Sequence, residues 1–354
     1  MISAAILLSL IGIVFTDPLL RILAVPEETY EYTRQYIRIV LLGLPFMFMT
    51  FVLQAALHGI GNSITSLVIQ IITVGLNVLL DPLLIYGIGF FPRLEVRGAA
   101  IATVIARVVS SAIAFTILLR GRKGVRLIAR NMIPEKHAMR MLLKIGVPAS
   151  VGQSVSALGF TVLQGVVNSF GTATIAAFGI GNRIISLFNM PAMGFSRATA
   201  VLVGQSLGAK NRKQAWQVIK LSVIIIAIFI IAGMSFMFFK GSSFVRLFVD
   251  DPEVLALGSS LFRIVSVGVV FFAMFMVLTG ALQGAGDTKT VMYLNLGRLW
   301  IVRVPLAYLM GYTMNLGPNG VWYAMLISNV LVSGVGFFVV ERGKWQDKIN
   351  PDEI

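Results

Sequence analysis

The chain has 354 residues, of which 57% are hydrophobic and only 12% are charged. A soluble domain carries about 25% charged residues, so the composition excludes a soluble globular protein and indicates an integral membrane protein. The absence of cysteine excludes a disulfide framework and thiolate chemistry. The net charge of +14 is typical of basic loops beside membrane spans, and we expect no nucleic-acid binding.

Long apolar stretches of about 20 residues favour helical spans over barrel strands, so we predict an all-α integral membrane fold. Ten such stretches can be read along the chain. They are Met1–Leu20, Arg38–Leu57, Ser66–Gly87, Gly98–Leu119, Met139–Phe170, Ala173–Leu207, Trp216–Phe239, Leu257–Leu282, Val291–Tyr312 and Gly320–Val340. The fifth and sixth exceed one crossing, so each must extend beyond the hydrocarbon or bend, and Pro148 and Pro191 supply the means.

Basic residues orient these spans. Alternate connections and the C-terminal tail hold sixteen lysines and arginines, and the opposite set holds seven. The positive-inside rule places the richer set, and with it both termini, in the cytoplasm of a multi-pass protein of the cell (inner) membrane. We therefore expect an N-terminal lobe over 1–120, a cytoplasmic linker over 121–138, a C-terminal lobe over 139–342 and a cytoplasmic tail over 343–354.

An internal repeat relates the two lobes. Ala56–Ser63 matches Ala281–Thr288 at an offset of 225, and Gly98–Ala102 matches Gly320–Ala324 at 222. The offset spans six helices, an even number, so the repeats are parallel. The second repeat has six segments and the first only four, so we expect two helices, about 85–90 residues, to be missing before Met1. The alternative is a genuine ten-helix protein.

Four polar residues lie on one face of the third segment, at steps of three, four and four: Gln70, Thr73, Asn77 and Asp81. Inserting an ionisable residue at the centre of a membrane-spanning helix costs about 2.5–3.5 kcal/mol of free energy. Such a residue therefore indicates a functional site. The repeat pairs Asp81 with Leu306 and Asn77 with Val302, so the fold does not require polar residues at these two places. The alternative is a structural polar cap near the outer end of the helix.

Six stretches together resemble the multidrug and toxic compound extrusion (MATE) transporters, most closely the branch named for the DNA-damage-inducible protein F. They are Asn77–Gly87, Gly98–Thr103, Lys144–Pro148, Met190–Gly194, Val203–Ala209 and Gly280–Thr288. The resemblance implies twelve helices in two six-helix lobes around a central cavity, of which ten are visible here. It also implies export of organic cations and amphipathic compounds in exchange for sodium or protons. In the family the partner aspartate lies on the first helix, which is one of the two that we expect to be missing before Met1.

We expect the cation site to consist of Asp81, Asn77, Thr103 and Tyr36. Asp81 lies six residues before Gly87, and Thr103 lies five residues after Gly98, so the two share a depth in the membrane. Asp81, Asn77 and Thr103 supply the oxygens that a hard cation such as Na+ needs, and Tyr36 could add a hydroxyl. A lone carboxylate serves Na+ and H+ equally, so either is expected as the coupling ion, and no other cofactor is expected.

A second polar stripe follows the fifth segment, and its residues either hydrogen-bond neighbouring helices or line a wet cavity. The cavity-lining candidates are Gln153, Ser154, Thr161, Gln164 and Asn168, together with Gln70, Thr73 and Arg298. No Asp or Glu lies within Met141–Phe170, so we expect no second acidic site there.

Two enzyme-like sequence patterns do not indicate a catalytic site. Gly204–Gly208 fits a nucleophile elbow without a preceding strand, and Gly284–Thr290 resembles a phosphate loop without its Gly-Lys-Ser/Thr ending.

We therefore expect a transporter and not an enzyme: a monomeric secondary antiporter for small amphipathic substrates, in contact with membrane lipid. One rival is a lipid-linked or polysaccharide flippase, which inward-facing Arg183, Arg298 and Arg303 would favour. The other is an inactive remnant, or a scaffold whose partner supplies helices.

Overall fold

The computed structural model describes residues 2–22, 25–89, 91–121 and 135–347. Most of the expected linker (residues 122–134) and of the expected tail (348–354) lies outside these ranges. The described residues form helices and no strand, which confirms the all-α fold class. The chain divides into two compact units, Met1–Ile133 and Pro134–Ile354.

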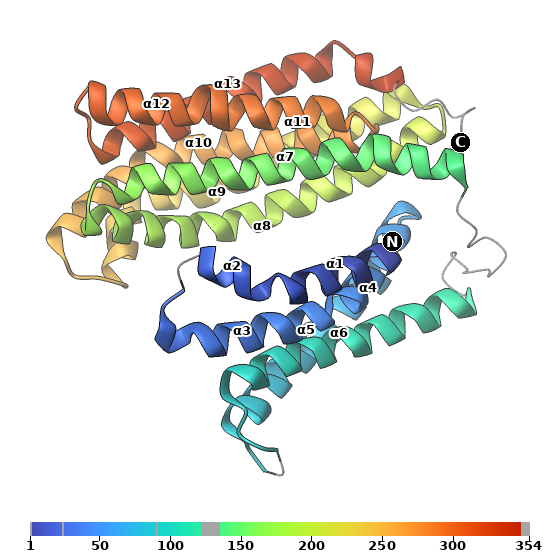
Figure 1. Ribbon diagram of the computed structural model, residues 1–354. Helices are drawn as coiled ribbons and strands as arrows, with labels where there is room; N and C mark the ends of the chain where they lie inside the picture. The colour runs from blue at the N-terminus through green and yellow to red at the C-terminus, as the bar shows by residue number, and fades with distance from the viewer. Residues whose placement is uncertain (1, 23–24, 90, 122–134, 348–354) are drawn as a thin grey trace. The chain divides into compact units, whose positions relative to one another are not determined.

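The first unit is built around α6 (Figure 1). Its elements are α1 (Ile2–Val14), α2 (Thr16–Ile22), α3 (Glu27–Leu42), α4 (Leu44–Gly59), α5 (Ser63–Tyr86) and α6 (Glu95–Arg120). Helix α6 packs against α3, α4 and α5. A small apolar core of Leu53, Leu57, Ile69, Ala114 and Leu118 joins α4, α5 and α6.

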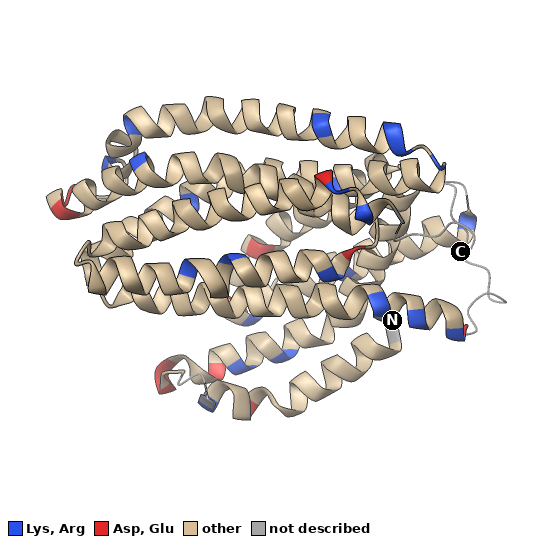
Figure 2. Ribbon diagram, turned by 90° about the horizontal axis from the view of Figure 1, so that it is seen from above, with Lys and Arg blue, Asp and Glu red and all other residues tan. Residues whose placement is uncertain are grey.

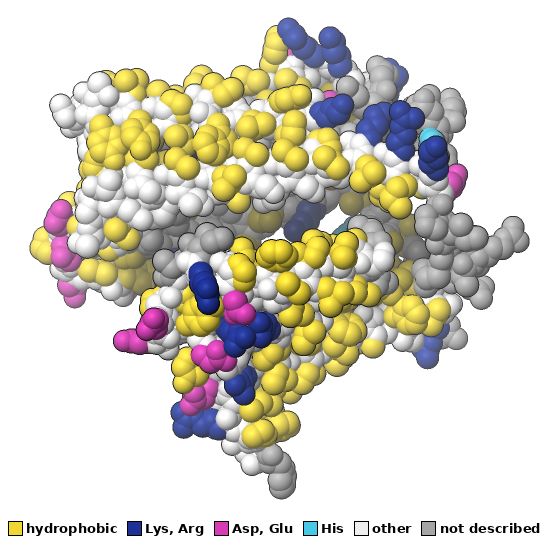
Figure 3. Space-filling model, in the orientation of Figure 1, with side chains coloured by type: hydrophobic (Ala, Val, Ile, Leu, Met, Phe, Trp, Pro, Cys, Tyr) yellow, Lys and Arg dark blue, Asp and Glu magenta, His cyan; other side chains and the backbone are white. Residues whose placement is uncertain are grey.

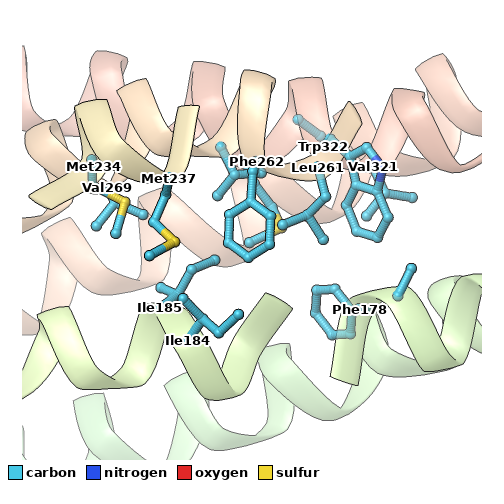
Figure 4. Close-up of a cluster of buried hydrophobic side chains, with 14 of the residues drawn as sticks. Phe178, Ile184, Ile185, Met234, Met237, Leu261, Phe262, Val269, Val321 and Trp322 are labelled. Atoms are coloured by element: carbon cyan, nitrogen blue, oxygen red, sulfur yellow. The ribbon is translucent and has the colours of Figure 1, made fainter. Parts of the chain in front are cut away.

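The second unit is built around α10. Its elements are α7 (Lys136–Asn168), α8 (Thr172–Gly208), α9 (Arg212–Arg246), α10 (Pro252–Gly284), α11 (Thr288–Leu296), a π-helical turn (Gly297–Arg303), α12 (Val304–Tyr308), a second π-helical turn (Leu309–Thr313), α13 (Pro318–Glu341) and a 3-10 turn (Lys344–Asp347). Helix α10 is mostly apolar and packs against α8, α9 and α13, which makes it the most buried of the candidate spans. Figure 4 shows part of this core, in which Phe178 of α8 stacks on Trp322 of α13 with ring centroids 5.5 Å apart.

All ten predicted segments are helical where the structure describes them. By length and hydropathy, six single helices of the described chain could cross a membrane: α5, α6, α7, α9, α10 and α13. The pair α3–α4 passes the same test as one span bent by 46°. Apolar side chains cover the sides of the helices (Figure 3), as lipid-facing surfaces require.

Three segments differ from their predicted form, and the first of them, Met1–Leu20, is divided at Phe15 into α1 and α2. The second helical segment begins at Glu27 and not at Arg38, because its first residues are amphipathic and too polar to register as apolar. The ninth is interrupted by π-helical turns on both sides of Pro305. Proline lacks the N–H that an α-helix needs at that position, and a locally wider helix is a common accommodation. By contrast, α7 and α8 each continue as one helix through Pro148 and Pro191.

Helices α8 and α10 approach each other at two glycines. A Cβ atom on Gly280 would lie 2.3 Å from the Ser196 carbonyl oxygen. One on Gly284 would lie 2.1 Å from the Ala200 carbonyl oxygen. The Ser196 hydroxyl also donates a hydrogen bond to the Met276 carbonyl at 2.6 Å. The clashing atoms belong to backbone, which cannot rotate away, so glycine is required for this crossing.

We therefore expect Gly284→Ala to lower the free energy of unfolding by about 3 kcal/mol, the upper end of the cost of overpacking. Thermal unfolding of the purified chain in detergent would measure the change. Gly194→Ala on α8 is the matched control, because a Cβ there meets nothing within 4 Å. Removing a helical glycine from that open position should be neutral or slightly stabilising. Equal melting temperatures for Gly284→Ala and Gly194→Ala would contradict the close approach of α8 and α10 at Gly284.

Candidate functional site

The close packing of α5 against α6 positions the predicted cation site. At the start of α6, a Cβ on Gly98 would lie 2.4 Å from the Leu84 carbonyl oxygen, so only glycine allows the two backbones to come this close. Helix α5 begins at an Asn62 cap, whose side chain accepts a hydrogen bond from the Thr65 amide, and ends at Gly87 with φ of 72°. These features fix where α5 starts and stops relative to α6.

Three of the four predicted ligands form one hydrogen-bonded cluster. The Asn77 amide nitrogen donates to an Asp81 carboxylate oxygen at 3.1 Å and to the Thr103 hydroxyl at 3.4 Å. Thr103 in turn donates to the Ala99 carbonyl at 2.9 Å. All three side chains are half-buried within their unit. No basic side chain among the described residues forms an ion pair with Asp81. The cluster therefore offers carboxylate, amide and hydroxyl oxygens without a fixed counter-charge, which suits an exchangeable cation.

Tyr36, the fourth predicted ligand, is not part of this cluster. It lies on α3 with 37% of its surface exposed, and its hydroxyl forms no hydrogen bond with a described residue. Its role in cation binding stays a prediction.

The other two residues of the α5 stripe have partners on neighbouring helices. Gln70 accepts a hydrogen bond from Gln54 of α4 at 3.4 Å. Thr73 is buried, donates to the Ile69 carbonyl at 2.7 Å, and shares a hydrogen bond with the Ser110 hydroxyl of α6. The stripe thus divides into an interhelical contact at Thr73 and a more open cluster at Asn77 and Asp81.

The polar stripe of α7 lies on the surface of the second unit. Gln153, Ser154, Thr161 and Asn168 are exposed, and Gln164 is half-buried. Their hydrogen bonds stay within α7: Gln164 donates to Asn168 at 2.8 Å, and Thr161 donates to the Ala157 carbonyl at 3.2 Å. None of these five side chains hydrogen-bonds another helix among the described residues, so the structure gives no support to interhelical bonding by this stripe.

Arg298 lies in the interior of the second unit and not on its surface. Only 3% of it is exposed, and its guanidinium carbon lies 4.7 Å from the ring centre of Phe272 and 5.7 Å from that of Phe275. The ring of Phe160 is 5.9 Å away. Aromatic faces attract a cation, so this ring cluster stabilises a charge that has no carboxylate partner among the described residues.

Arg303 forms a second buried cationic contact that sequence reasoning did not identify. Its Nε donates to the Ser328 hydroxyl at 2.8 Å, and Nη2 donates to the Asn329 side-chain oxygen. The Asn329 amide then donates to the Gly268 carbonyl at 3.1 Å, which ties α13 to α10. The polar pair Ser328-Asn329 within the apolar segment Gly320–Val340 was the sequence signal for this network.

Asn329→Leu should lower the free energy of unfolding by about 3 kcal/mol, because it leaves Nη2 of the buried Arg303 guanidinium without its acceptor and removes the hydrogen bond to the Gly268 carbonyl. Asn329→Asp keeps the acceptor for Arg303 and adds the opposite charge but loses the donor to the Gly268 carbonyl, so its stability should lie between those of Asn329→Leu and the wild type. Thermal unfolding would measure both.

Asn182→Leu, the same change at an exposed position of α8, is the control. An Asn329→Leu protein as stable as this control would contradict the proposed dependence of Arg303 on Asn329.

Comparisons with known proteins agree with this architecture. The MatE family profile matches residues 1–83 and 148–309. The probable multidrug resistance protein YoeA of Bacillus subtilis is 28% identical over 347 residues, which cover 95% of this chain and 74% of that protein. The FAD transporter of Shewanella oneidensis is 27% identical over 335 residues, 95% of this chain and 74% of that protein. An outward-facing multidrug resistance MATE family transporter superposes with a TM-score of 0.88 at 24% identity, over 98% of this chain and 76% of that one.

Proposed function

Because the chain belongs to the MatE family of membrane transporters, we propose that it is a secondary antiporter. It exports amphipathic or cationic organic compounds in exchange for Na+ or H+. The observation that carries the coupling proposal is the Asn77–Asp81–Thr103 cluster, an ionisable group in an apolar helix with only neutral described partners. The membrane location agrees with the six single helices, and the bent pair, that could span a bilayer.

Coupling follows from the energetics of Asp81. Placing an ionised carboxylate within a span costs about 2.5–3.5 kcal/mol at a helix centre and less near an end, where Asp81 lies, and a bound Na+ or H+ lowers this cost. If the cation and the organic substrate differ in their affinity for the outward and inward states, each shifts the same equilibrium. Asn77 holds the carboxylate through its amide hydrogen, and Thr103 fixes Asn77 from the neighbouring helix. The two neutral side chains thus orient the acid without neutralising it.

The substrate class rests on the relatives. The Bacillus subtilis relative is named a probable multidrug resistance protein, which supports export of varied organic compounds. The Shewanella oneidensis relative is named an FAD transporter, and FAD is a phosphate-bearing anion. This second name supports a different candidate, a carrier of anionic or lipid-linked phosphate compounds. Arg183 and Arg197 are exposed on α8 and could serve such a substrate, whereas Arg298 and Arg303 are buried.

Asp81→Asn should reduce ion-driven export of ethidium from proteoliposomes about tenfold or more, because the amide cannot change charge and loses its coupling free energy. Asp250→Asn, which makes the same change in an exposed loop, is the control and should retain transport. Equal export by the two variants would overturn the antiporter proposal.

Asn77→Leu separates sodium from proton coupling. If Na+ is the ion, the variant loses a neutral oxygen ligand, and the Na+ concentration for half-maximal export should rise about tenfold. If H+ is the ion, export should follow the pH gradient and stay independent of Na+ in both proteins. A Na+ series at fixed pH measures the difference, with Gln214→Leu on the exposed start of α9 as the control.

A separate experiment tests whether the substrates are anionic, phosphate-bearing compounds. If phosphate-bearing compounds are the substrates, Arg183→Gln together with Arg197→Gln should abolish uptake of labelled FAD by proteoliposomes and spare ethidium. If organic cations are the substrates, wild-type protein should transport ethidium and not FAD.

A further inference from the structure

The second unit carries a groove that the proposed transport cycle does not use. It lies among α9, α10 and α13 and has a volume of about 440 Å³. Lys213, Trp216, Gln217 and Lys220 line one end, and Val223, Ile224, Leu278 and Phe337 line the rest. The wall of the groove is apolar, because Lys213 and Lys220 contribute mainly their aliphatic stems to it, and the part between these two lysines is called its basic end.

The α9 residues of the groove recur at helical spacing, so they lie on one face of that helix. From Lys213 to Ile224 this face is about 16 Å long, close to half of the roughly 30 Å hydrocarbon thickness of a bilayer. The wall of the groove is almost entirely apolar, which suits a hydrocarbon chain.

The basic end gathers cations from two parts of the chain. Lys213 and Lys220 form no ion pair with any described residue. The 3-10 turn after α13 packs there, because the buried Trp345 meets the edge of Trp216 at 6.1 Å between ring centres. This contact carries Lys344 to the same end of the unit (the basic residues are blue in Figure 2).

The Trp345 indole is fixed by a 2.7 Å hydrogen bond to the Val340 carbonyl, and Val340 itself lines the groove. Tryptophan is typical of the membrane–water interface, and the half-buried Trp216 is the member of the pair that could face it, since Trp345 is buried.

We propose that this groove binds an anionic phospholipid of the phosphatidylglycerol type. Its phosphate lies against Lys213 and Lys220, and one acyl chain runs along Val223, Ile224 and Phe337. Unpaired lysines at headgroup depth attract a negative lipid, each contributing about as much as a single basic residue near an anionic membrane surface. The site requires only that the unit span a membrane, so it does not depend on the transport proposal or on the cation cluster in the first unit.

Native mass spectrometry of the delipidated full chain in detergent, titrated with phosphatidylglycerol, would test the proposal. Lys213→Gln with Lys220→Gln should raise the lipid concentration for half-saturation about tenfold or more. Lys136→Gln with Lys144→Gln, which removes the same charge from exposed α7, should change it less than twofold. Ile224→Phe narrows the groove without changing charge and should also weaken binding.

Four outcomes would overturn the proposal. The two double variants could lose binding equally, which would indicate a general charge effect. Phosphatidylcholine with the same chains could bind as tightly, or inorganic phosphate could displace the lipid, and either would remove the need for an anionic headgroup on an acyl chain. A lysine-dependent dimer in the absence of lipid would assign this face to a second copy of the chain.

Discussion

Hydrocarbon offers no hydrogen bonds, so a polar side chain within a span is costly unless another group of the protein satisfies it. Thr73 meets Ser110, Asn77 meets Thr103, and Arg303 meets Asn329, each across a pair of neighbouring helices. These contacts need backbones that approach closely, which explains why glycines occupy the crossings. Polar contacts between helices and glycines at helix crossings therefore occur together, because the first need the close approach that the second allow.

The internal repeat uses the same helix pair in both units but with opposite charge. At the offset of 225, Thr73 corresponds to Arg298, and Asp81 corresponds to Leu306. The first unit places a carboxylate on its version of this helix, and the second places two buried guanidinium groups. In the first unit the charge meets only neutral, half-buried partners, whereas in the second it is enclosed by rings and amides. A common scaffold thus carries two different electrostatic environments.

Sequence alone predicted the helical segments well, because the apolar length of a span is a strong signal. It also predicted that Asn77, Asp81 and Thr103 would meet, since equal depth on adjacent antiparallel helices follows from the helical rise. It missed the early start at Glu27, because an amphipathic turn is not apolar on average. The burial of Arg298 and the network of Arg303 depend on which face each helix turns inward, and a single segment does not encode that contact.

This difference in burial bears on where an exchangeable ion can reside. The Arg303 guanidinium is enclosed by Ser328 and Asn329, and Asn329 in turn bonds α10, so this group serves packing and helps to fix how α13 sits on α10. The half-buried Asp81 carboxylate, by contrast, lies beside an amide and a hydroxyl, and this is the arrangement on which the coupling proposal rests. Arg298 and Arg303 are only 3% and 2% exposed, so the charges of the second unit are far less accessible than the acid of the first. Satisfaction of polar groups by neighbouring side chains therefore encloses the charges of the second unit and leaves that of the first unit partly open.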